Sequence, residues 1–329
     1  MDTIGIIGAG AWGTALALVA RRAGRRATLW AHETETVAAI RERRENPFLP
    51  GVELDPAIAA TNDMAEAAAA DAILLVPPAQ HLRAVAAALA PHAKRDAPVI
   101  ICAKGIETKT GALMSEALAA AMPRARAGIL SGPTFAAEVA RDMPTAVTLA
   151  TADEAAGVSL VAALASRHFR IYRSDDVIGA QLGGAVKNVI AIACGVVMGR
   201  GLGDNARAAL ITRGLAEIAR LGRAMGAKPE TIMGLSGLGD LALTCTGEQS
   251  RNLSLGIALG RGEKIADILA RRRSVAEGVA TAGSVVTLAA RHGVEMPIAA
   301  AVDAVANKGA DVDAAIAALL ARPPAQEEA

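Results

Sequence analysis

Near the amino terminus, the run Gly8-Ala9-Gly10-Ala11-Trp12-Gly13 follows a short apolar stretch and opens a longer one with helical spacing. A G-x-G-x-x-G pattern has a physical meaning in this strand–turn–helix context. Gly8 permits the tight turn, Gly10 lets the backbone approach a pyrophosphate, and Gly13 lets the helix pack closely on the strand. The amino terminus of the helix then faces the phosphates. The run predicts a dinucleotide-binding unit. A glycine-rich turn without a ligand and a methyltransferase loop are the alternatives.

The first half of the chain alternates short apolar runs with alanine-rich helical stretches such as residues 14–23 and 82–89. Strands that alternate with helices at this spacing indicate a parallel sheet covered by helices on both faces. The expected strands are residues 3–7, 27–30, 72–76, 99–103, 128–130 and 146–149.

After about residue 175 the strand-like runs disappear and long helical patterns take over. The expected helices are residues 182–198, 206–222, 253–259, 265–271, 282–292, 298–305 and 314–321. We therefore predict an α/β Rossmann-type doubly wound domain over residues 1–180 and an all-α domain over residues 181–329. Methyltransferase sheets do not usually precede an all-helical half, which disfavours that alternative.

Composition excludes several functional classes. The formal net charge is +1 and aromatic residues make up 2% of the chain, so neither a polyanionic partner nor a base-stacking surface is indicated. Five scattered histidines give no support for a metal site. Residues 3–20 carry no charge but lack a basic flank and are interrupted by glycines, which disfavours a signal or membrane segment. Three unpaired cysteines among apolar neighbours (Cys102, Cys194 and Cys245) fit buried thiols in a reducing, cytoplasmic compartment.

The end of the second strand bears on the choice of cofactor. A carboxylate at this point binds the ribose 2′-hydroxyl of NAD. Here the strand ends at Trp30-Ala31-His32, and the first acid, Glu33, comes late. Without a fixed carboxylate, a 2′-phosphate meets no repulsion and His32 can lie beside it. This favours NADP(H) or the use of both NADP(H) and NAD(H), although His32 also fits an exposed loop.

Lys187 is the only charged residue between residues 182 and 198, and Asn188 is the only other strongly polar one. An unpaired buried ammonium is costly, so such a lysine either extends to the surface or is functional. We expect Gly183-Gly184-Ala185 to leave open space in which a ligand can approach it. Burial can bring the pKa of a lysine towards neutrality, which suits a general acid–base.

Two further segments of the second half concentrate polar groups. Three glycines lead into Asp240, and Thr244 lies on the same face if Asp240 begins a helical turn. A carboxylate there can orient a lysine and keep it charged, although a capping aspartate after a glycine loop fits equally. Ser250-Arg251-Asn252 precedes a helix and offers a phosphate seat. The alternative is an ordinary cap with a surface arginine.

Two loops follow predicted strands of the first half. Lys104-Gly105 comes after residues 99–103, and Ser131-Gly132-Pro133-Thr134-Phe135 comes after residues 128–130. Both lie at carboxyl ends of parallel strands, where ligands of such sheets bind. Lys104 is therefore a candidate for substrate or cofactor binding, against the alternative of a surface lysine.

Taken together, these segments resemble the NAD(P)-dependent glycerol-3-phosphate dehydrogenase family in its bacterial form, over nearly the whole chain. The runs that carry the resemblance are Gly8 to Gly13, Asn46-Pro47-Phe48-Leu49-Pro50-Gly51, Lys104-Gly105-Ile106-Glu107, Ser131-Gly132-Pro133-Thr134-Phe135-Ala136, Gly183-Gly184-Ala185-Val186-Lys187-Asn188, Gly237-Leu238-Gly239-Asp240-Leu241, Ser250-Arg251-Asn252 and Val275-Ala276-Glu277-Gly278. The fifth and sixth runs are specific in combination. The implied fold is that of 6-phosphogluconate dehydrogenase.

The resemblance implies the reduction of dihydroxyacetone phosphate, a small phosphorylated three-carbon substrate, to sn-glycerol 3-phosphate for glycerophospholipid synthesis. Lys187 would be the acid–base, and Lys104, Asp240 and Thr244 would surround the same carbonyl. The implied substrate-binding residues are Lys104, Gly132, Thr134, Lys187, Asp240, Ser250, Arg251 and Asn252. The implied cofactor-binding residues are Gly8, Gly10, Ala11, Trp12, Gly13, His32, Lys104, Ala136, Arg251, Val275 and Glu277.

Two positions depart from the expected family pattern. Ala11 stands where many relatives carry a small hydroxyl residue, so one phosphate hydrogen bond is lost. Pro78 stands where a serine often follows the Val-Pro of a strand end, so a side-chain cap is lost, although proline fits a first helical turn.

Other functions remain compatible with parts of this pattern. A two-domain dehydrogenase for a β-hydroxy acid or a ketopantoate-like substrate also uses a buried lysine on the first helix after the sheet domain, but does not need the Ser250-Arg251-Asn252 seat. A non-catalytic NAD-binding sensor is a second alternative, which the presence of Lys187, Asp240 and Arg251 disfavours. The alanine-rich second half is compatible with a homodimer.

Overall fold

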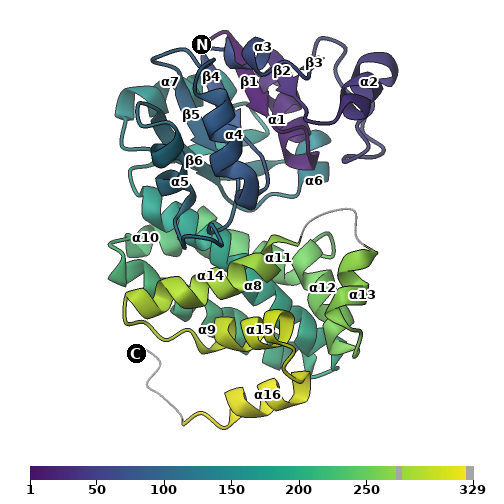
Figure 1. Cartoon of the computed structure of the whole chain (residues 1–329), viewed down its shortest axis with the longest axis vertical. Helices are drawn as coiled ribbons and strands as arrows, with labels where there is room; N and C mark the ends of the chain where they lie inside the picture. Colours follow the sequence, from purple (N-terminus) through teal and green to yellow (C-terminus); the bar gives the residue numbers. More distant parts are fainter. Residues whose placement is uncertain (272–275, 324–329) are drawn as a thin grey trace.

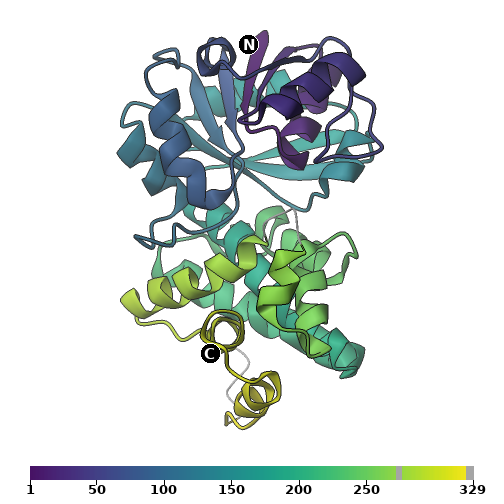
Figure 2. The same ribbon diagram turned by 45° about the vertical axis from the view of Figure 1, so that its right-hand side comes forward.

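The computed structural model describes residues 1–271 and 276–323, which form two domains at opposite ends of the molecule (Figure 1). The first contains the sheet and its covering helices. The second is helical, and Figure 2 shows that its last helix lies at the end of the molecule farthest from the sheet. This order agrees with the fold class predicted from the sequence.

The first domain is built on an eight-stranded sheet with the strand order β3-β2-β1-β4-β5-β6-β7-β8. The first six strands of this order form the doubly wound arrangement of dinucleotide-binding folds. The strands are β1 (Thr3–Ile7), β2 (Arg26–Trp30), β3 (Ala59–Thr61), β4 (Ala72–Leu75), β5 (Pro98–Ile101), β6 (Arg126–Ser131), β7 (Thr145–Ala150) and β8 (Phe169–Ser174).

Alternation along the strands produces two hydrophobic cores, one on each face of the sheet. In β4, Leu74 belongs to one core, while Ile73 and Leu75 belong to the other. Because successive side chains of a strand point to opposite faces, strands that are apolar throughout need helices on both sides. One core is shared with α1 (Ala11–Arg22), α2 (Thr34–Arg43), α6 (Ala136–Ala140) and α7 (Glu154–Leu164), and the other with α3 (Met64–Ala68), α4 (Leu82–Leu89) and α5 (Met114–Ala121).

Three features of the sheet differ from the sequence-based expectation. The expected parallel sheet is wrong at one position, because β7 runs antiparallel to β6, with Leu130 opposite Leu149. The expected strand list also lacks β3 and β8. β3 has only three residues, and β8 is an edge strand in which Arg170, Tyr172 and Arg173 are exposed, so neither has the apolar run of a buried strand.

The second domain is assembled around α8 (Val177–Gly199), which contacts α9, α11, α12, α14 and α15. This helix is long and apolar enough to cross a bilayer, but 78% of its most apolar window is buried inside the protein, as expected of a core helix. The other elements are α9 (Gly203–Ala224), α10 (Pro229–Ile232), the π-helical turn η2 (Leu235–Gly239), α11 (Asp240–Thr246), α12 (Arg251–Gly260), α13 (Ile265–Ala270), α14 (Glu277–Arg291), α15 (Pro297–Lys308) and α16 (Val312–Leu320).

The first turn of α8 joins the two domains. The side chain of Asp176 caps the helix by accepting a hydrogen bond from the backbone N–H of Gly179. Ala180 packs in the core of the sheet domain, whereas Leu182 packs in the helical core. We therefore propose that the domains divide at residues 180 and 181, within a continuous helix.

Candidate active site

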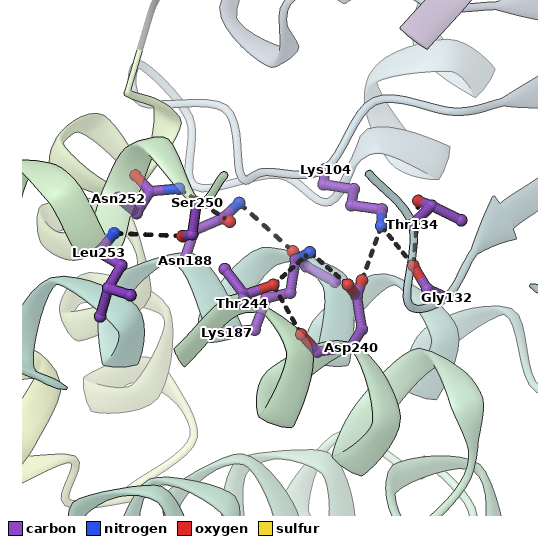
Figure 3. Close-up of polar contacts among 11 residues, drawn as sticks. Lys104, Gly132, Thr134, Lys187, Asn188, Asp240, Thr244, Ser250, Asn252 and Leu253 are labelled. Atoms are coloured by element: carbon purple, nitrogen blue, oxygen red, sulfur yellow. Dashed lines mark hydrogen bonds and ion pairs between the residues drawn. The ribbon is translucent and has the colours of Figure 1, made fainter. Parts of the chain in front are cut away.

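Lys187, the buried lysine of α8, points at two polar groups of α11 (Figure 3). Its Nζ donates to Asp240 Oδ1 at 2.5 Å and to Thr244 Oγ1 at 3.0 Å. Lys187 is 6% exposed and Asp240 is fully buried. α11 begins at Asp240, so Thr244 lies one turn further on the same face, as the sequence predicted. The lysine is thus held as a paired ammonium at the edge of the helical core.

Lys104 completes this cluster from the sheet domain. Its Nζ donates to Asp240 Oδ2 at 2.6 Å and to the carbonyl oxygen of Gly132 at 2.9 Å. The hydroxyl of Thr134 donates to the same carbonyl at 3.3 Å. Lys104 and Gly132 follow β5 and β6, so the cluster lies at the carboxyl ends of parallel strands, where ligands of such sheets bind. The Lys104–Asp240 ion pair therefore links the two domains, while Lys187 binds the same carboxylate from within the helical domain.

The glycines before Lys187 have a different role from the one expected. A Cβ on Gly183 would lie 2.3 Å from the backbone oxygen of Ser236, and one on Gly184 would lie 2.7 Å from Ser131 Oγ. The expectation that they leave open space for a ligand is wrong, because that space is filled by η2 and by the end of β6. Their missing side chains instead let α8 approach η2, the turn that leads into Asp240.

Burial changes the acid–base properties of the cluster. It lowers the pKa of Lys187 from 10.5 to about 8, while the negative charge of Asp240 opposes this shift and the positive charge of Lys104 adds to it. A lysine with a pKa close to neutrality exchanges a proton readily at cellular pH. The arrangement can therefore supply a proton to an oxygen placed beside Lys187, or remove one from it.

A chain of buried amides connects the lysine helix with the predicted phosphate seat. Asn252 Nδ2 donates to Asn188 Oδ1 at 3.0 Å, and Asn252 Oδ1 accepts from the backbone N–H of Gly278 at 3.1 Å. No role was predicted for Asn188 from the sequence. Its position beside Lys187 in an apolar helix was the available signal, because buried amides need partners.

The predicted phosphate seat lies at the start of α12. Ser250 is the N-cap, and its Oγ accepts from the backbone N–H of Leu253 at 3.2 Å. The hydroxyl proton of a capping serine stays available for a ligand. Arg251 is exposed, while Ser250 and Asn252 are buried. Ser250 therefore caps the helix, as in the alternative considered for this segment, and its hydroxyl proton remains available to an anion.

The glycine loop has the geometry expected of a pyrophosphate-binding turn. Gly8 has a φ of +121°, and a Cβ there would lie 2.8 Å from the backbone of Val76. Gly10 has nothing within 4 Å of the position of a Cβ, and a Cβ on Gly13 would lie 1.8 Å from the carbonyl oxygen of Gly8. The loop therefore needs glycine at the first and third positions and is open at the second.

The other candidate cofactor residues are distributed around this loop. His32 is exposed after β2, Ala11 opens α1, and Ala136 opens α6. The buried indole N–H of Trp12 has no acceptor within the part of the chain that the structure describes. An unpaired buried donor beside the loop fits a bound polar group. The remaining candidate, Val275, lies outside the described residues.

Glu277 joins the two domains near Pro78, the position at which a side-chain cap was expected to be lost. Its Oε1 accepts from the backbone N–H of Ala79 at 3.0 Å, so a carboxylate of α14 replaces that cap. Burial raises the pKa of Glu277 above its usual 4.5, against the opposing effects of this hydrogen bond and of the positive charge of Arg251. Among residues 1–271 and 276–323, no group of three or more His, Cys, Asp or Glu side chains is arranged to hold a metal ion.

Comparisons with known proteins agree with this arrangement. Residues 3–157 match the family described as NAD-dependent glycerol-3-phosphate dehydrogenase N-terminus, and residues 176–317 match the corresponding C-terminus. A relative from Rhodospirillum rubrum, named glycerol-3-phosphate dehydrogenase (NAD(P)+), is 61% identical over 325 residues, which cover 98% of this chain and 93% of the relative.

Solved structures show the same similarity. The crystal structure of glycerol-3-phosphate dehydrogenase from Coxiella burnetii matches with a TM-score of 0.94 and 38% identity, covering 98% of this chain and 99% of that one. A ketopantoate reductase from Ralstonia eutropha matches with a TM-score of 0.60 and 17% identity, covering 95% and 99%. The second likeness is one of fold alone, and the two-domain architecture is therefore no guide to the substrate.

Proposed function

The chain belongs to the NAD-dependent glycerol-3-phosphate dehydrogenase family, and we propose that Lys187 is the acid–base of the reaction that it catalyses. That reaction is the NAD(P)-dependent interconversion of dihydroxyacetone phosphate and sn-glycerol 3-phosphate. The observation that carries the proposal is the buried Lys187–Asp240–Thr244 cluster, to which Lys104 is joined from the other domain.

In the reductive direction, the ammonium of Lys187 donates a proton to the carbonyl oxygen as that oxygen gains negative charge. The reduced nicotinamide supplies the hydride. Asp240 keeps Lys187 charged before the reaction, and Thr244 fixes the direction of its Nζ. Lys104 binds the other oxygen of the same carboxylate, and its positive charge stabilises the developing oxyanion. In the oxidative direction, the neutral amine of Lys187 accepts the hydroxyl proton.

The substrate phosphate is held by the start of α12 in this proposal. Ser250, Arg251 and Asn252 supply a hydroxyl, a guanidinium and an amide at a helix amino terminus, which together suit a dianion. Gly132 and Thr134 border the reacting end of the substrate beside Lys104. Because the phosphate is anchored away from the reacting carbon, its binding energy serves to orient that carbon, and this orientation is the main requirement of such a reduction.

Gly8 to Gly13 and the start of α1 would hold the pyrophosphate of the dinucleotide. His32 lies at the end of β2, where the adenine ribose of such cofactors is bound. No carboxylate immediately follows this strand, so we propose that the enzyme accepts NADPH as well as NADH. Trp12, Ala136, Val275 and Glu277 are the further residues that we propose to line the cofactor.

A homodimer is the assembly that we propose. α16 is apolar in composition, yet none of its residues is buried, and Leu320 is 81% exposed. An open apolar cavity of about 1280 Å³ lies between α16 and helices α8, α9 and α15. Two copies that share this face bury apolar surface which one copy leaves in water. Light scattering tests this, and Leu320→Glu is expected to give a monomer.

We place the enzyme in the cytoplasm, where it supplies the backbone of glycerophospholipids. The three cysteines are buried and unpaired, which is compatible with a reducing compartment.

The direct test compares purified wild type with Lys187→Ala, following the absorbance of NADPH or NADH in the presence of dihydroxyacetone phosphate. We expect turnover by wild type, a loss of about 1,000-fold in kcat for Lys187→Ala, and no measurable turnover of phosphate-free dihydroxyacetone. Lys228→Ala is the matched control, because Lys228 is an exposed lysine of the same domain. A folded wild type that binds the cofactor but does not turn over the phosphorylated substrate would contradict the assignment and favour a β-hydroxy acid substrate or a sensor.

A further inference from the structure

The run Asn46-Pro47-Phe48-Leu49-Pro50-Gly51 contributes no group to the chemistry described above, yet its first residue contacts the glycine loop directly. Asn46 follows α2 and is 1% exposed. From its contacts we propose that Asn46 is a positioning residue for the cofactor, which fixes the glycine loop in the conformation that binds the pyrophosphate. The inference rests on the proposed binding of the dinucleotide at Gly8 to Gly13.

The orientation of the Asn46 amide follows from its contacts. The backbone N–H of Phe48 donates to Asn46 Oδ1 at 2.9 Å, so the oxygen faces its own segment. The nitrogen therefore faces the loop, where Nδ2 donates to the carbonyl oxygen of Ala9 at 2.9 Å and to Thr14 Oγ1 at 2.7 Å. Both protons of the amide are used.

Thr14 extends this contact to the next peptide of the loop. Its hydroxyl accepts from Asn46 and donates to the carbonyl oxygen of Gly10 at 2.9 Å, and its backbone N–H donates to the same carbonyl at 3.0 Å. Thr14 is fully buried. A single buried amide thus holds the carbonyl groups of two consecutive residues, Ala9 directly and Gly10 through one hydroxyl.

Holding these carbonyls determines where the loop amides point. In a trans peptide the C=O and the N–H of one unit point in opposite directions, and residues 1–271 and 276–323 contain no cis peptide. With the oxygens of Ala9 and Gly10 held behind the loop, the N–H groups of Gly10 and Ala11 point to the open side. These are the donors that a pyrophosphate needs at the start of a helix.

The sequence of the run is suited to this task. Pro47 fixes its own φ, which favours the turn between Asn46 and Phe48. Leu49 is buried in the same core as Ala9 and Leu16, so the run is anchored beside the loop that it supports. The support matters more here because Ala11 has no hydroxyl to bind phosphate, which leaves the backbone N–H groups to carry that interaction.

The test measures the affinity for NADPH by its fluorescence, together with kcat and both KM values. Asn46→Ala removes both loop contacts, and we expect the Kd and KM for NADPH to rise about tenfold, with kcat at saturating cofactor and the KM for dihydroxyacetone phosphate within about twofold of wild type. Thr14→Val keeps Asn46 but removes the hydroxyl that reaches Gly10. It is expected to weaken NADPH binding about threefold.

Thr151→Val is the matched control for a purely structural effect. Thr151 is a buried threonine of the same domain whose hydroxyl donates to the carbonyl oxygen of Ala127 at 2.9 Å. It directly follows β7, which runs antiparallel to β6, so it lies at the edge of the sheet opposite the carboxyl ends of the parallel strands. We expect it to lower the Tm while leaving the Kd for NADPH unchanged.

Wild-type affinity for NADPH in both Asn46→Ala and Thr14→Val would overturn the inference, as would a Thr151→Val variant that loses the same affinity. If Asn46→Ala does not fold, Thr14→Val decides alone. A wild type that binds no dinucleotide contradicts the proposed function itself, whereas a wild type that binds it and variants that bind equally well contradict only the role of Asn46.

Discussion

At the scale of single residues, the proposed role of Lys187 makes the rate in each direction depend on pH. Burial lowers the pKa of Lys187 to about 8. Reduction needs the ammonium, so its kcat/KM is expected to be constant below about pH 8 and to fall tenfold per unit above it. Oxidation needs the neutral amine and is expected to rise with pH up to the same value. Measured pH–rate profiles in the two directions check this, and a reductive rate that rises above pH 8 would contradict it.

Lys104 allows a sharper test of the same pKa. Its positive charge lowers the pKa of Lys187, because two ammonium groups share one carboxylate. Lys104→Met keeps the length of the side chain and removes the charge. We expect a lower kcat/KM overall, with the pH of half-maximal reductive activity displaced upward. An unchanged midpoint would show that Lys187 is not the group that titrates.

The sequence allowed part of this cluster to be predicted. Lys187 is identifiable as a charge in an apolar helix, and the spacing of Asp240 and Thr244 places them on one helical face. The pairing of Lys104 with Asp240 is not readable from the chain, since 136 positions separate them and only the folded domains bring them together. The glycines were misinterpreted for a similar reason, because a missing side chain makes room equally for a ligand and for a packed helix.

At the scale of elements, the contact between α8 and η2 sets the distance from Lys187 to Asp240. Gly183→Ala would put a Cβ 2.3 Å from the backbone oxygen of Ser236, and backbone cannot move aside as a side chain can. We expect a loss of about 1–3 kcal/mol in the free energy of unfolding, together with a drop in kcat, because α8 and η2 separate. Urea denaturation and steady-state kinetics measure the two effects.

Gly222→Ala in α9 is the control for this substitution. There a Cβ would lie 3.3 Å or more from side-chain atoms of Ala227 and Ile232. Alanine favours a helix over glycine by about 1 kcal/mol, which offsets the close contact with the Ala227 Cβ, so this variant is expected to be about as stable as wild type, with normal activity. If both alanine variants behave alike, close helix packing is not what positions Lys187.

Glu217 holds the start of α15 and gives the helical domain a pH-dependent stability. Its carboxylate accepts from the backbone N–H groups of Ile298 and Ala299 at 2.7 and 3.3 Å, in a helix whose own N-cap has no side-chain bond. Burial raises the pKa of Glu217 from 4.5 to about 7, against those two hydrogen bonds and the charges of Arg220 and Arg213. The folded state therefore keeps a proton that the unfolded chain releases, and stability is lost as the pH rises from about 4.5 through 7.

Glu217→Gln has no such titration. We expect the difference in unfolding free energy between wild type and this variant to move in favour of the variant between pH 4.5 and 8, by at most about 3 kcal/mol. Urea denaturation at the two pH values measures the difference. A difference that does not change with pH would show that Glu217 titrates alike in the folded and unfolded chains.

The elements themselves were largely predictable, because long apolar patterns define them. The strands from β1 to β7, apart from β3, and the expected helices of the second domain appear at or near their predicted positions. The direction of a strand, unlike its position, could not be predicted from the apolar pattern. Residues 145–150 read as an apolar strand in either orientation, and the antiparallel pairing with β6 depends on how the short α6 turns the chain. Hydrophobic pattern carries no information on that turn.

At the scale of the whole molecule, Asp240 acts as the anion between two domains. Lys104 reaches it from the sheet domain and Lys187 from α8, at 2.6 and 2.5 Å. Lys104 and Asp240 come from different domains, so their ion pair contributes to the position of one domain on the other, together with the first turn of α8, which packs in the core of the sheet domain. Glu277 adds a second link at the backbone of Ala79. The proposed mechanism uses residues of both domains, so we expect the charged contacts between the domains to affect activity and stability together.

Asp240→Asn tests this link, because the amide keeps the shape and leaves two ammonium groups facing each other without an anion. Losing one partner of a buried ion pair costs on the order of 3 kcal/mol, so we expect a large fall in unfolding free energy at pH 7 and almost no activity.

The negative charge of Asp240 raises the pKa of Lys187, so in the variant Lys187 is neutral at lower pH than in wild type. The folded variant then loses the Lys187 proton at a lower pH than folded wild type, so the penalty is expected to be smaller at pH 9 than at pH 7, with the change complete near pH 8, above which Lys187 is neutral in both folded proteins. Asp175→Asn, which breaks an exposed ion pair with Lys228, is the control and is expected to change stability little at either pH. A penalty that is equal at both pH values would show that Lys187 carries no charge in the folded wild type. A penalty that is equal in the two variants would show that the domains are held together by other contacts.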